Sequence, residues 1–153
     1  MSDFDMVIRG GTVVNAAEIS ECDVGVKNGR IVALGENLAA GAQEIDATGK
    51  YVMPGGKDSH CHIDQRSSGC GRNSETFESG TRSAACGGTT TIICFAAQEK
   101  GELLTPVVEE YHEKAKQSCI DYSFHLIISD PSDEVIHEEV PKQIGRASCR
   151  ERV

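Results

Sequence analysis

The run Asp58-Ser59-His60-Cys61-His62 carries the side chains best suited to chemistry in this chain. In a β-strand, residues two apart point to the same side, so His60 and His62 would share one face, with Asp58 behind them. Two imidazoles at this spacing can hold one divalent metal ion from one side. Neutral imidazole suits Zn²⁺, and less exclusively Mn²⁺, Fe²⁺ or Co²⁺. His60 and His62 are therefore the candidate metal ligands, with zinc as the first choice.

The position of the pair in the chain strengthens this interpretation, because an isolated His-x-His motif is weak. Residues 57–63 are predicted to be a strand that directly follows the Pro54-Gly55-Gly56 bend, and a polar segment follows at 66–74. In a βα barrel, the C-terminal ends of the strands form the active-site face. A histidine pair at the end of the first such strand would stand on that face.

The other histidines have simpler explanations. His125 falls in a predicted buried strand, where a hydrogen-bonded core histidine is more common than a metal ligand. His112 and His137 are expected in solvent on helix surfaces. Cys61 alternates with the two candidate ligands, so it should face away from them and pack in the core.

Acidic and amide side chains near the motif are weaker candidates still. Asp64 and Gln65 could line the mouth of a site, although loop polarity alone explains them. The sequence also holds a cluster of glutamates in a predicted helix, which is expected to be a solvated face and not a catalytic pair: Glu109, Glu110 and Glu113.

The elements that must position the motif fall into two regions. Residues 1–53 alternate short β-rich runs with turns, and Asn28-Gly29 is a strong hairpin signal. This pattern predicts a small β-sandwich or partial barrel. So short a region offers little independent core, and strands from elsewhere would help to complete it. The predicted strands are 4–8, 12–14, 23–27, 30–34, 44–46 and 51–53.

Residues 54–143 alternate strands and helices, which predicts a parallel sheet. Strands are predicted at 57–63, 89–95 and 122–129. Helices are predicted from an N-cap at Ser74 to the Gly87-Gly88 pair, over 104–115, and from Asp130-Pro131 onward. Three βα units are too few to close a (β/α)₈ barrel. The expected fold is therefore α/β: a partial TIM-like barrel preceded by the small β-sandwich domain.

Composition excludes several classes of partner. The 153 residues have a net charge of −9, which argues against nucleic acid and anionic membranes as general partners. No apolar stretch approaches the roughly 20 residues of a membrane span, and the acidic start lacks the basic region of a signal peptide. The sequence has seven cysteines, an odd number, and no CxxC motif. Reduced thiols in a cytoplasmic protein are therefore expected.

Residues 144–153 differ in character from the rest, with three Arg and one Glu after an acidic segment. Their sequence resembles, residue by residue, the translation of a common sequencing adaptor: ATC GGA AGA GCG TCG TGT AGG GAA AGA GTG. The adaptor's preceding AG fits a CAG codon for Gln143. We therefore expect these ten residues to be an artefact, and the natural protein to continue beyond residue 143 with its own sequence.

At this point the motifs carry a family resemblance. The stretch Val52-Met53-Pro54-Gly55-Gly56-x-Asp58-x-His60-x-His62 resembles the first-strand signature of the amidohydrolase superfamily. Further stretches resemble its dihydropyrimidinase and hydantoinase branch, and together they cover residues 4–143. These are VIRGGTVV at 7–14, IDATGK at 45–50, AACGGTTTI at 84–92, FAAQ at 95–98, IDYSFHLI at 120–127 and Asp130-Pro131.

The resemblance implies hydrolysis of a small cyclic amide, a dihydropyrimidine or a hydantoin, to an N-carbamoyl amino acid. It implies a binuclear metal centre, usually zinc, that lowers the pKa of a water molecule and polarises the ring carbonyl. His60 and His62 would bind one of the metals. The other ligands (a carboxylated Lys, two His and an Asp) and an oxyanion-holding Tyr would lie beyond this chain, as would the strands that complete the β-sandwich. The full-length protein is expected to be a homotetramer, and the 153-residue segment to be inactive alone.

Lys57 departs from the family pattern, which usually has an apolar residue there. An ammonium buried near a metal centre would cost several kcal/mol unless it reaches solvent.

The alternative function is that of the non-catalytic dihydropyrimidinase-related proteins, scaffolds that assemble cytoskeletal partners. Intact His60 and His62 favour the enzyme, because a scaffold has no chemical need for them.

Overall fold

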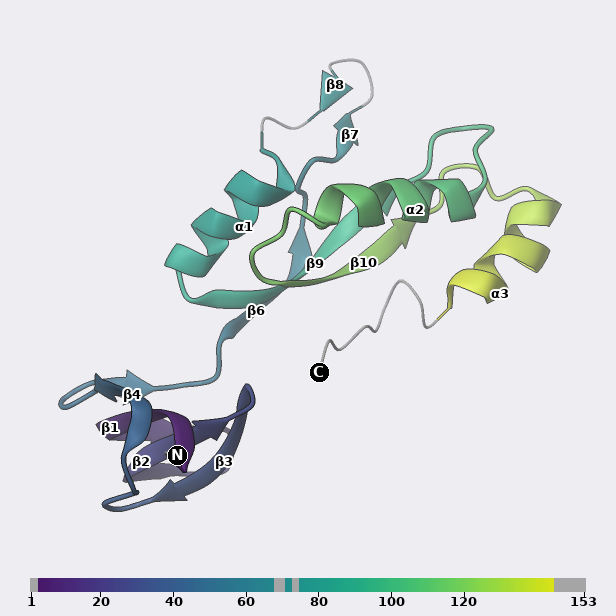
Figure 1. Ribbon diagram of the computed structural model, residues 1–153. Coiled ribbons are helices and arrows are strands. Elements are labelled where there is room, and N and C mark those ends of the chain that lie inside the picture. The colour runs from purple at the N-terminus through teal and green to yellow at the C-terminus, as the bar shows by residue number, and fades with distance from the viewer. Residues whose placement is uncertain (1–2, 68–70, 73–74, 145–153) are drawn as a thin grey trace. The chain divides into compact units, whose positions relative to one another are not determined.

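A computed structural model describes residues 3–67, 71–72 and 75–144 (Figure 1). The chain divides between Pro54 and Gly55 into two compact units. No helix within the described part of the chain is long and apolar enough to cross a membrane.

The first unit is one five-stranded sheet. Its strands are β1 (Phe4–Val14), β2 (Ile19–Lys27), β3 (Arg30–Gly35), β4 (Gly41–Asp46) and β5 (Tyr51–Val52). The order is β3-β2-β1-β4, with β5 also paired to β1. β2 runs antiparallel to both β1 and β3, whereas β4 and β5 run parallel to β1.

Two glycine-containing pairs shape this sheet differently. Asn28 and Gly29 form the predicted hairpin turn between β2 and β3, with φ angles of 51° and 72°. The break predicted between strands 4–8 and 12–14, at Gly10-Gly11, is instead a bulge within one long strand, because the β1–β2 register shifts between Ile8 and Gly11. Gly10 supplies the left-handed residue, with φ of 63°, that lets the strand continue.

A carboxylate joins β2 to β1 in the first unit. Asp23 accepts hydrogen bonds from the Gly10 backbone N–H at 3.0 Å and from Arg9 Nη1 at 2.8 Å. These bonds hold the pKa of Asp23 below its ordinary value, the Gly10 bond contributing most. The unit also leaves several apolar side chains exposed to solvent: Ile19, Ile31, Val32, Leu34, Ile45, Tyr51 and Met53.

The second unit is built on a parallel three-stranded sheet, as the alternation of strands and helices predicts. β6 (Gly56–Cys61), β9 (Thr89–Ala97) and β10 (Asp121–Ile127) lie in the order β10-β9-β6. α1 (Phe77–Cys86) and α2 (Leu104–Ala115) connect successive strands. The segment expected to be a polar loop contains a two-stranded ribbon, β7 (Arg66–Ser67) and β8 (Gly71–Arg72). A π-helical turn, η1 (Val135–Glu139), leads into α3 (Val140–Gln143).

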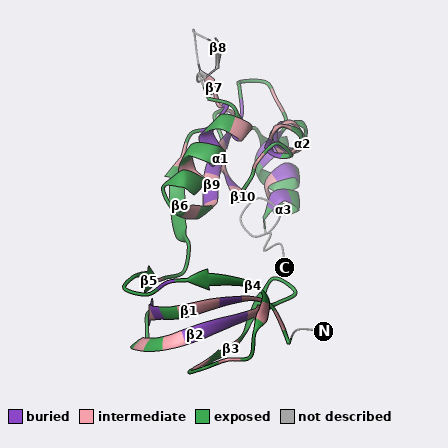
Figure 2. Ribbon diagram, turned by 60° about the vertical axis from the view of Figure 1, so that its left-hand side comes forward, coloured by how far each residue is buried: buried purple, intermediate pink, exposed green. Residues whose placement is uncertain are grey.

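Both connecting helices pack on the same face of this sheet. Figure 2 shows buried residues, in purple, on β9 and on α2. The alternation of β9 explains the two faces, since Cys94 is fully buried while Phe95 points to the other side. The core cluster comprises Ile63, Phe77, Ile92, Cys94, Ala96, Val107, Tyr111, Ala115 and Phe124.

Two helix starts differ from the sequence prediction. α1 is capped by Thr76, whose hydroxyl accepts the Ser79 N–H at 3.2 Å while Ser79 Oγ accepts the Thr76 N–H at 3.1 Å. The predicted cap, Ser74, lies outside the described residues. The last helical segment starts after Ser132, not at Asp130-Pro131, because Asp130 Oδ2 instead accepts the Gly101 N–H at 2.9 Å. Ser132 Oγ accepts the Val135 N–H at 3.3 Å.

Candidate metal site at the end of the first barrel strand

His60 and His62 lie side by side where β6 ends. Their ring centroids are 5.3 Å apart, and both residues are exposed. Phe95 of β9 lies against both rings, with its centroid 4.6 Å from His60 and 4.8 Å from His62. The pair therefore stands on the face of the sheet opposite the two helices, supported by one aromatic ring.

A hydrogen bond orients the imidazole of His62. Its Nδ1 is bonded to Gln65 Oε1, an amide oxygen that can only accept. With Nδ1 as the donor to this oxygen, a neutral His62 ring presents the lone pair of Nε2. Metal-ligating histidines are commonly held in this way by a partner on the other ring nitrogen. Gln65 thus has a more specific contact than loop polarity predicts.

Asp58 contacts the backbone of the motif. Its Oδ1 accepts the N–H of His60 at 3.0 Å. The pairing of β6 with β9 shifts register between Asp58 and Cys61, so His60 lies in an irregular part of the strand. Lys57, one residue earlier, is exposed, which avoids the burial cost considered above for its ammonium.

Cys61 faces away from the histidine pair, as predicted from strand alternation. It is half-buried against the core, and its Sγ lies 3.4 Å from Sγ of Cys94. This hydrogen bond lowers the pKa of Cys61, whereas the same bond together with burial raises the pKa of Cys94. Both residues are free cysteines.

His125 is hydrogen-bonded, as predicted, but it is only half-buried and lies outside the core. It pairs in register with Phe95, and their rings are 5.2 Å apart. Its Nε2 lies 3.1 Å from the carbonyl oxygen of Ser59. His125 therefore shares the sheet face of His60 and His62, on the opposite side of Phe95.

Of the two helical histidines, one departs from the prediction. His137 is exposed, as expected. His112 is half-buried, with its ring 5.0 Å from that of Phe124 and 6.0 Å from that of Tyr122. The prediction of a solvated His112 was wrong because β10 presents an aromatic surface that a helical pattern alone does not reveal.

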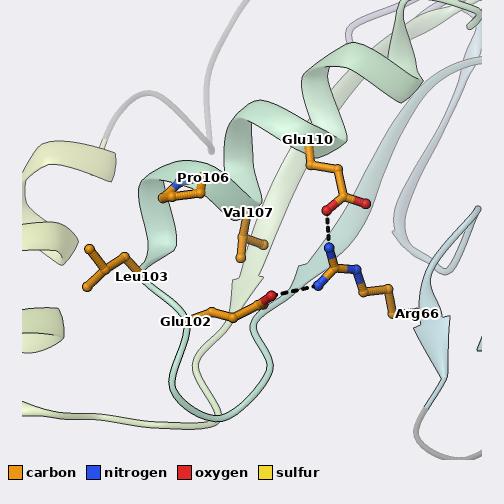
Figure 3. Close-up of a pocket in the computed structure, with 6 residues that line it drawn as sticks. All are labelled: Arg66, Glu102, Leu103, Pro106, Val107 and Glu110. Atoms are coloured by element: carbon orange, nitrogen blue, oxygen red, sulfur yellow. Dashed lines mark hydrogen bonds and ion pairs between the residues drawn. The ribbon is translucent and has the colours of Figure 1, made fainter.

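The acidic helix face also differs in part from the prediction. Glu109 and Glu113 are exposed, but Glu110 pairs with Lys114 at 2.7 Å and with Arg66. Arg66 also binds Glu102 at 2.9 Å, and Figure 3 shows this arginine between the two carboxylates. Burial raises the pKa of Glu110, but the two cations outweigh it and leave that pKa below its ordinary value.

These groups line a cavity of about 220 Å³ beside the start of α2, together with Leu103, Pro106 and Val107. Arg66 is 44 residues from Glu110, so no local pattern in the sequence could have indicated the pair.

Asp64, the other acidic candidate, is buried and has a left-handed backbone with φ of 47°. Its N–H donates to the Glu75 carbonyl at 3.1 Å, so its backbone helps to fold this segment back on itself.

The histidine pair supplies two potential metal donors. Among the residues that the structure describes, no group of three or more His, Cys, Asp or Glu side chains is placed to hold a metal ion. A complete site would need further ligands from outside this set.

Comparison with known proteins identifies the relatives of this chain. No family model matches it. It is 49% identical over 140 residues to the D-hydantoinase of Geobacillus stearothermophilus, covering 90% of this chain and 29% of that protein. It is 42% identical over 131 residues to the dihydropyrimidinase of Arabidopsis thaliana, covering 84% of this chain and 24% of that protein.

Solved structures agree with the sequence relatives. A D-hydantoinase crystal structure matches with a TM-score of 0.85 and 44% identity, over 93% of this chain and 31% of that one. The dihydropyrimidinase of Brevibacillus agri matches with a TM-score of 0.84 and 42% identity, over 91% of this chain and 30% of that one. The chain thus spans about 30% of the length of its relatives.

The fold is an α/β arrangement in which the first sheet corresponds to part of a β-sandwich and the parallel sheet to the start of a TIM barrel, as in the N-terminal part of hydantoinase structures. This is the architecture of the amidohydrolase superfamily. Within it, the chain belongs to the hydantoinase and dihydropyrimidinase branch.

Proposed function

We propose that this chain is the N-terminal part of a metal-dependent cyclic amidohydrolase. The observation that carries the proposal is the pair His60 and His62, 5.3 Å apart at the C-terminal end of the first parallel strand. Strand ends of this kind form the active-site face of a βα barrel. The relatives with 42–49% identity to this chain include D-hydantoinases from several bacteria, which supports the same class of reaction.

The residues present fit a metal ion of the zinc class. His60 and His62 offer imidazole nitrogens from one side, and the Gln65 bond leaves the lone pair of His62 on Nε2. The remaining ligands would be a carboxylated Lys, two His and an Asp from the rest of the protein. When bound, the metal ions would lower the pKa of a water molecule and polarise the ring carbonyl.

The substrate that we propose is a small cyclic amide, a hydantoin or a dihydropyrimidine. Water would add across the ring C–N bond, with its oxygen going to the carbonyl carbon and a proton to the ring nitrogen, to give an N-carbamoyl amino acid. In this reaction Phe95 supports the two imidazoles and Gln65 keeps the His62 ring in one orientation.

We also propose a cytoplasmic homotetramer for the complete protein. The five described cysteines are free, which suits a reducing compartment. The exposed apolar side chains of the first unit, such as Ile31 and Val32 on β3, would be covered by strands from the rest of the protein.

The test is the double variant His60→Ala/His62→Ala in the complete protein encoded by the gene. Bound zinc, measured by mass spectrometry, and turnover of hydantoin and dihydrouracil should both be lost. His137→Ala, an exposed histidine on η1, is the matched control and should keep both. A double variant with wild-type metal content and turnover contradicts the proposal. A wild-type protein without metal or turnover would instead favour a non-catalytic scaffold.

A further inference from the structure

His125 reaches across a strand to contact the backbone beside the candidate metal ligands. β10, which carries His125, and β6 lie on opposite sides of β9, so the two strands are not paired to each other. His125 Nε2 nevertheless lies 3.1 Å from the carbonyl oxygen of Ser59 on β6. A carbonyl oxygen can only accept, so Nε2 carries the proton of this bond.

The bond falls where the strand is irregular. The register between β6 and β9 shifts between Asp58 and Cys61, the interval that holds Ser59 and His60. A strand with an irregular ladder is held less firmly by backbone hydrogen bonds, and bulges commonly redirect a side chain. A side-chain bond to the Ser59 carbonyl restrains the peptide group that joins Ser59 to His60.

Phe95 completes the connection between the two sides. Its ring centroid is 5.2 Å from that of His125, 4.6 Å from His60 and 4.8 Å from His62. His125 therefore limits the motion of the candidate ligands in two ways, through the Ser59 carbonyl and through the ring of Phe95.

We propose that His125 is a positioning residue for the metal site, and that its Nε2–H bond to the Ser59 carbonyl fixes the direction of His60 and His62. This inference rests on the proposed function, because it assumes that the pair binds metal. Nε2 of His125 is already a donor, so that atom has no lone pair to offer a metal.

Two substitutions of His125 separate positioning from other roles. Phe keeps the ring and its packing but removes the donor, whereas Gln places an amide N–H near the position of Nε2. In the complete protein, His125→Phe should weaken zinc affinity about 10- to 100-fold, the range found for groups that orient metal ligands. His125→Gln should stay within about threefold of wild type. His137→Phe is the matched control and should have no effect.

Zinc affinity is measured by competition with a chelator, and kcat and KM for hydantoin are measured at saturating zinc. Wild-type protein that binds no zinc would refute the proposed function, and His125 would then have no metal site to position. If wild type binds zinc and His125→Phe binds equally well, the positioning role is wrong. If Gln and Phe weaken binding equally, the N–H donor is not what supports the site, and the positioning role is again wrong.

A measurement on wild-type protein covers the case in which a variant does not fold. Solid-state NMR of protein labelled with ¹⁵N-histidine distinguishes the two neutral tautomers. Nε2–H is expected for His125 and Nδ1–H for His62. An Nδ1–H tautomer at His125 would overturn the proposal.

Discussion

Glu139 caps α2 from a helical segment more than thirty residues later in the chain. Its Oε2 accepts the backbone N–H of Thr105 at 2.8 Å, and Gln143 Nε2 donates to Thr105 Oγ1 at 2.9 Å. The residue at the N-cap of α2 itself, Leu103, makes no capping bond. A carboxylate near a helix N-terminus also interacts favourably with the helix dipole. The last helical segment therefore stabilises the start of α2 by a tertiary contact.

Glu139→Ala should destabilise this helix start by about 1 kcal/mol, the usual cost of losing a cap. The matched control is Glu138→Ala, because Glu138 is the exposed neighbour on the same turn. Hydrogen exchange of the Thr105 amide in the complete protein measures the effect, and it should be about fivefold faster in Glu139→Ala. Equal exchange in the two variants would show that the capping bond contributes nothing.

The same contact predicts a pH dependence. The hydrogen bonds from Thr105 lower the pKa of Glu139 below its ordinary value of 4.5. A carboxylate with a lowered folded-state pKa adds stability that is fully present above the unfolded pKa and is lost as the pH falls through the folded one. The stability difference between wild type and Glu139→Gln should therefore shrink as the pH falls below about 4.5. Denaturant titrations at pH 7 and at stepwise lower pH test this, and a constant difference would contradict it.

Gly55 leaves no room for a side chain. A Cβ at this position would lie 2.0 Å from Thr90 Oγ1 and 2.7 Å from Thr90 Cβ. Rotation of Thr90 could relieve the first contact but not the second, so the backbone would have to move. Gly55→Ala should lower the melting temperature by several degrees, since overpacking costs about 1–3 kcal/mol.

Gly87→Ala is the control for this prediction, because its Cβ would meet the Ala84 carbonyl at an ordinary 3.4 Å. Thermal unfolding of both variants in the complete protein, followed by circular dichroism, gives the comparison. Equal melting temperatures would mean that the segment between the units adapts without cost.

Features set by local pattern could be predicted from the sequence. Strand alternation placed His60 and His62 on one face and Cys61 on the other, and the apolar run at 89–95 gave the central strand β9. Features that depend on distant partners could not. The Asp130-Pro131 pair predicts a helix cap, but the Asp130 carboxylate accepts the N–H of Gly101, 29 residues away.

The surroundings of the candidate site show the same limit. The Arg66–Glu110 pair joins residues 44 apart, and the His125–Ser59 contact joins residues 66 apart. Neither has a periodic signal, because each depends on which strands and helices become neighbours. The run of apolar residues around His125 predicts a core position, but among the described residues no helix covers that face of its strand.

Residues 144–153 are predicted to be absent from the natural protein. They match an adaptor translation over ten residues, and Gln143 fits the preceding bases. Resequencing the source locus across codon 143 should show a different sequence, followed by codons for a Lys, two His and an Asp in suitable order. Genomic codons that encode the same ten residues would contradict this prediction.

The 153-residue chain by itself is predicted to lack amidohydrolase activity. Two imidazoles are too few for a catalytic zinc site, which takes three protein ligands in most enzymes, and the described residues offer no further cluster. β10 and β6 are both edge strands of the described parallel sheet, and the apolar edge of β10 favours aggregation. The exposed apolar residues of β3 add to this tendency.

Three measurements on the expressed 153-residue chain test this prediction: turnover of hydantoin, zinc bound per chain, and the cooperativity of thermal unfolding. We expect no turnover, less than one tightly bound zinc and a broad transition, because the sheet edges and the metal site both lack partners. The complete protein is the positive control for all three. A soluble monomer with a sharp melting transition and about two bound zinc ions would contradict the prediction. The zinc ligands would then have to include residues that are given other roles above. His125 would be the first of these residues to test by substitution.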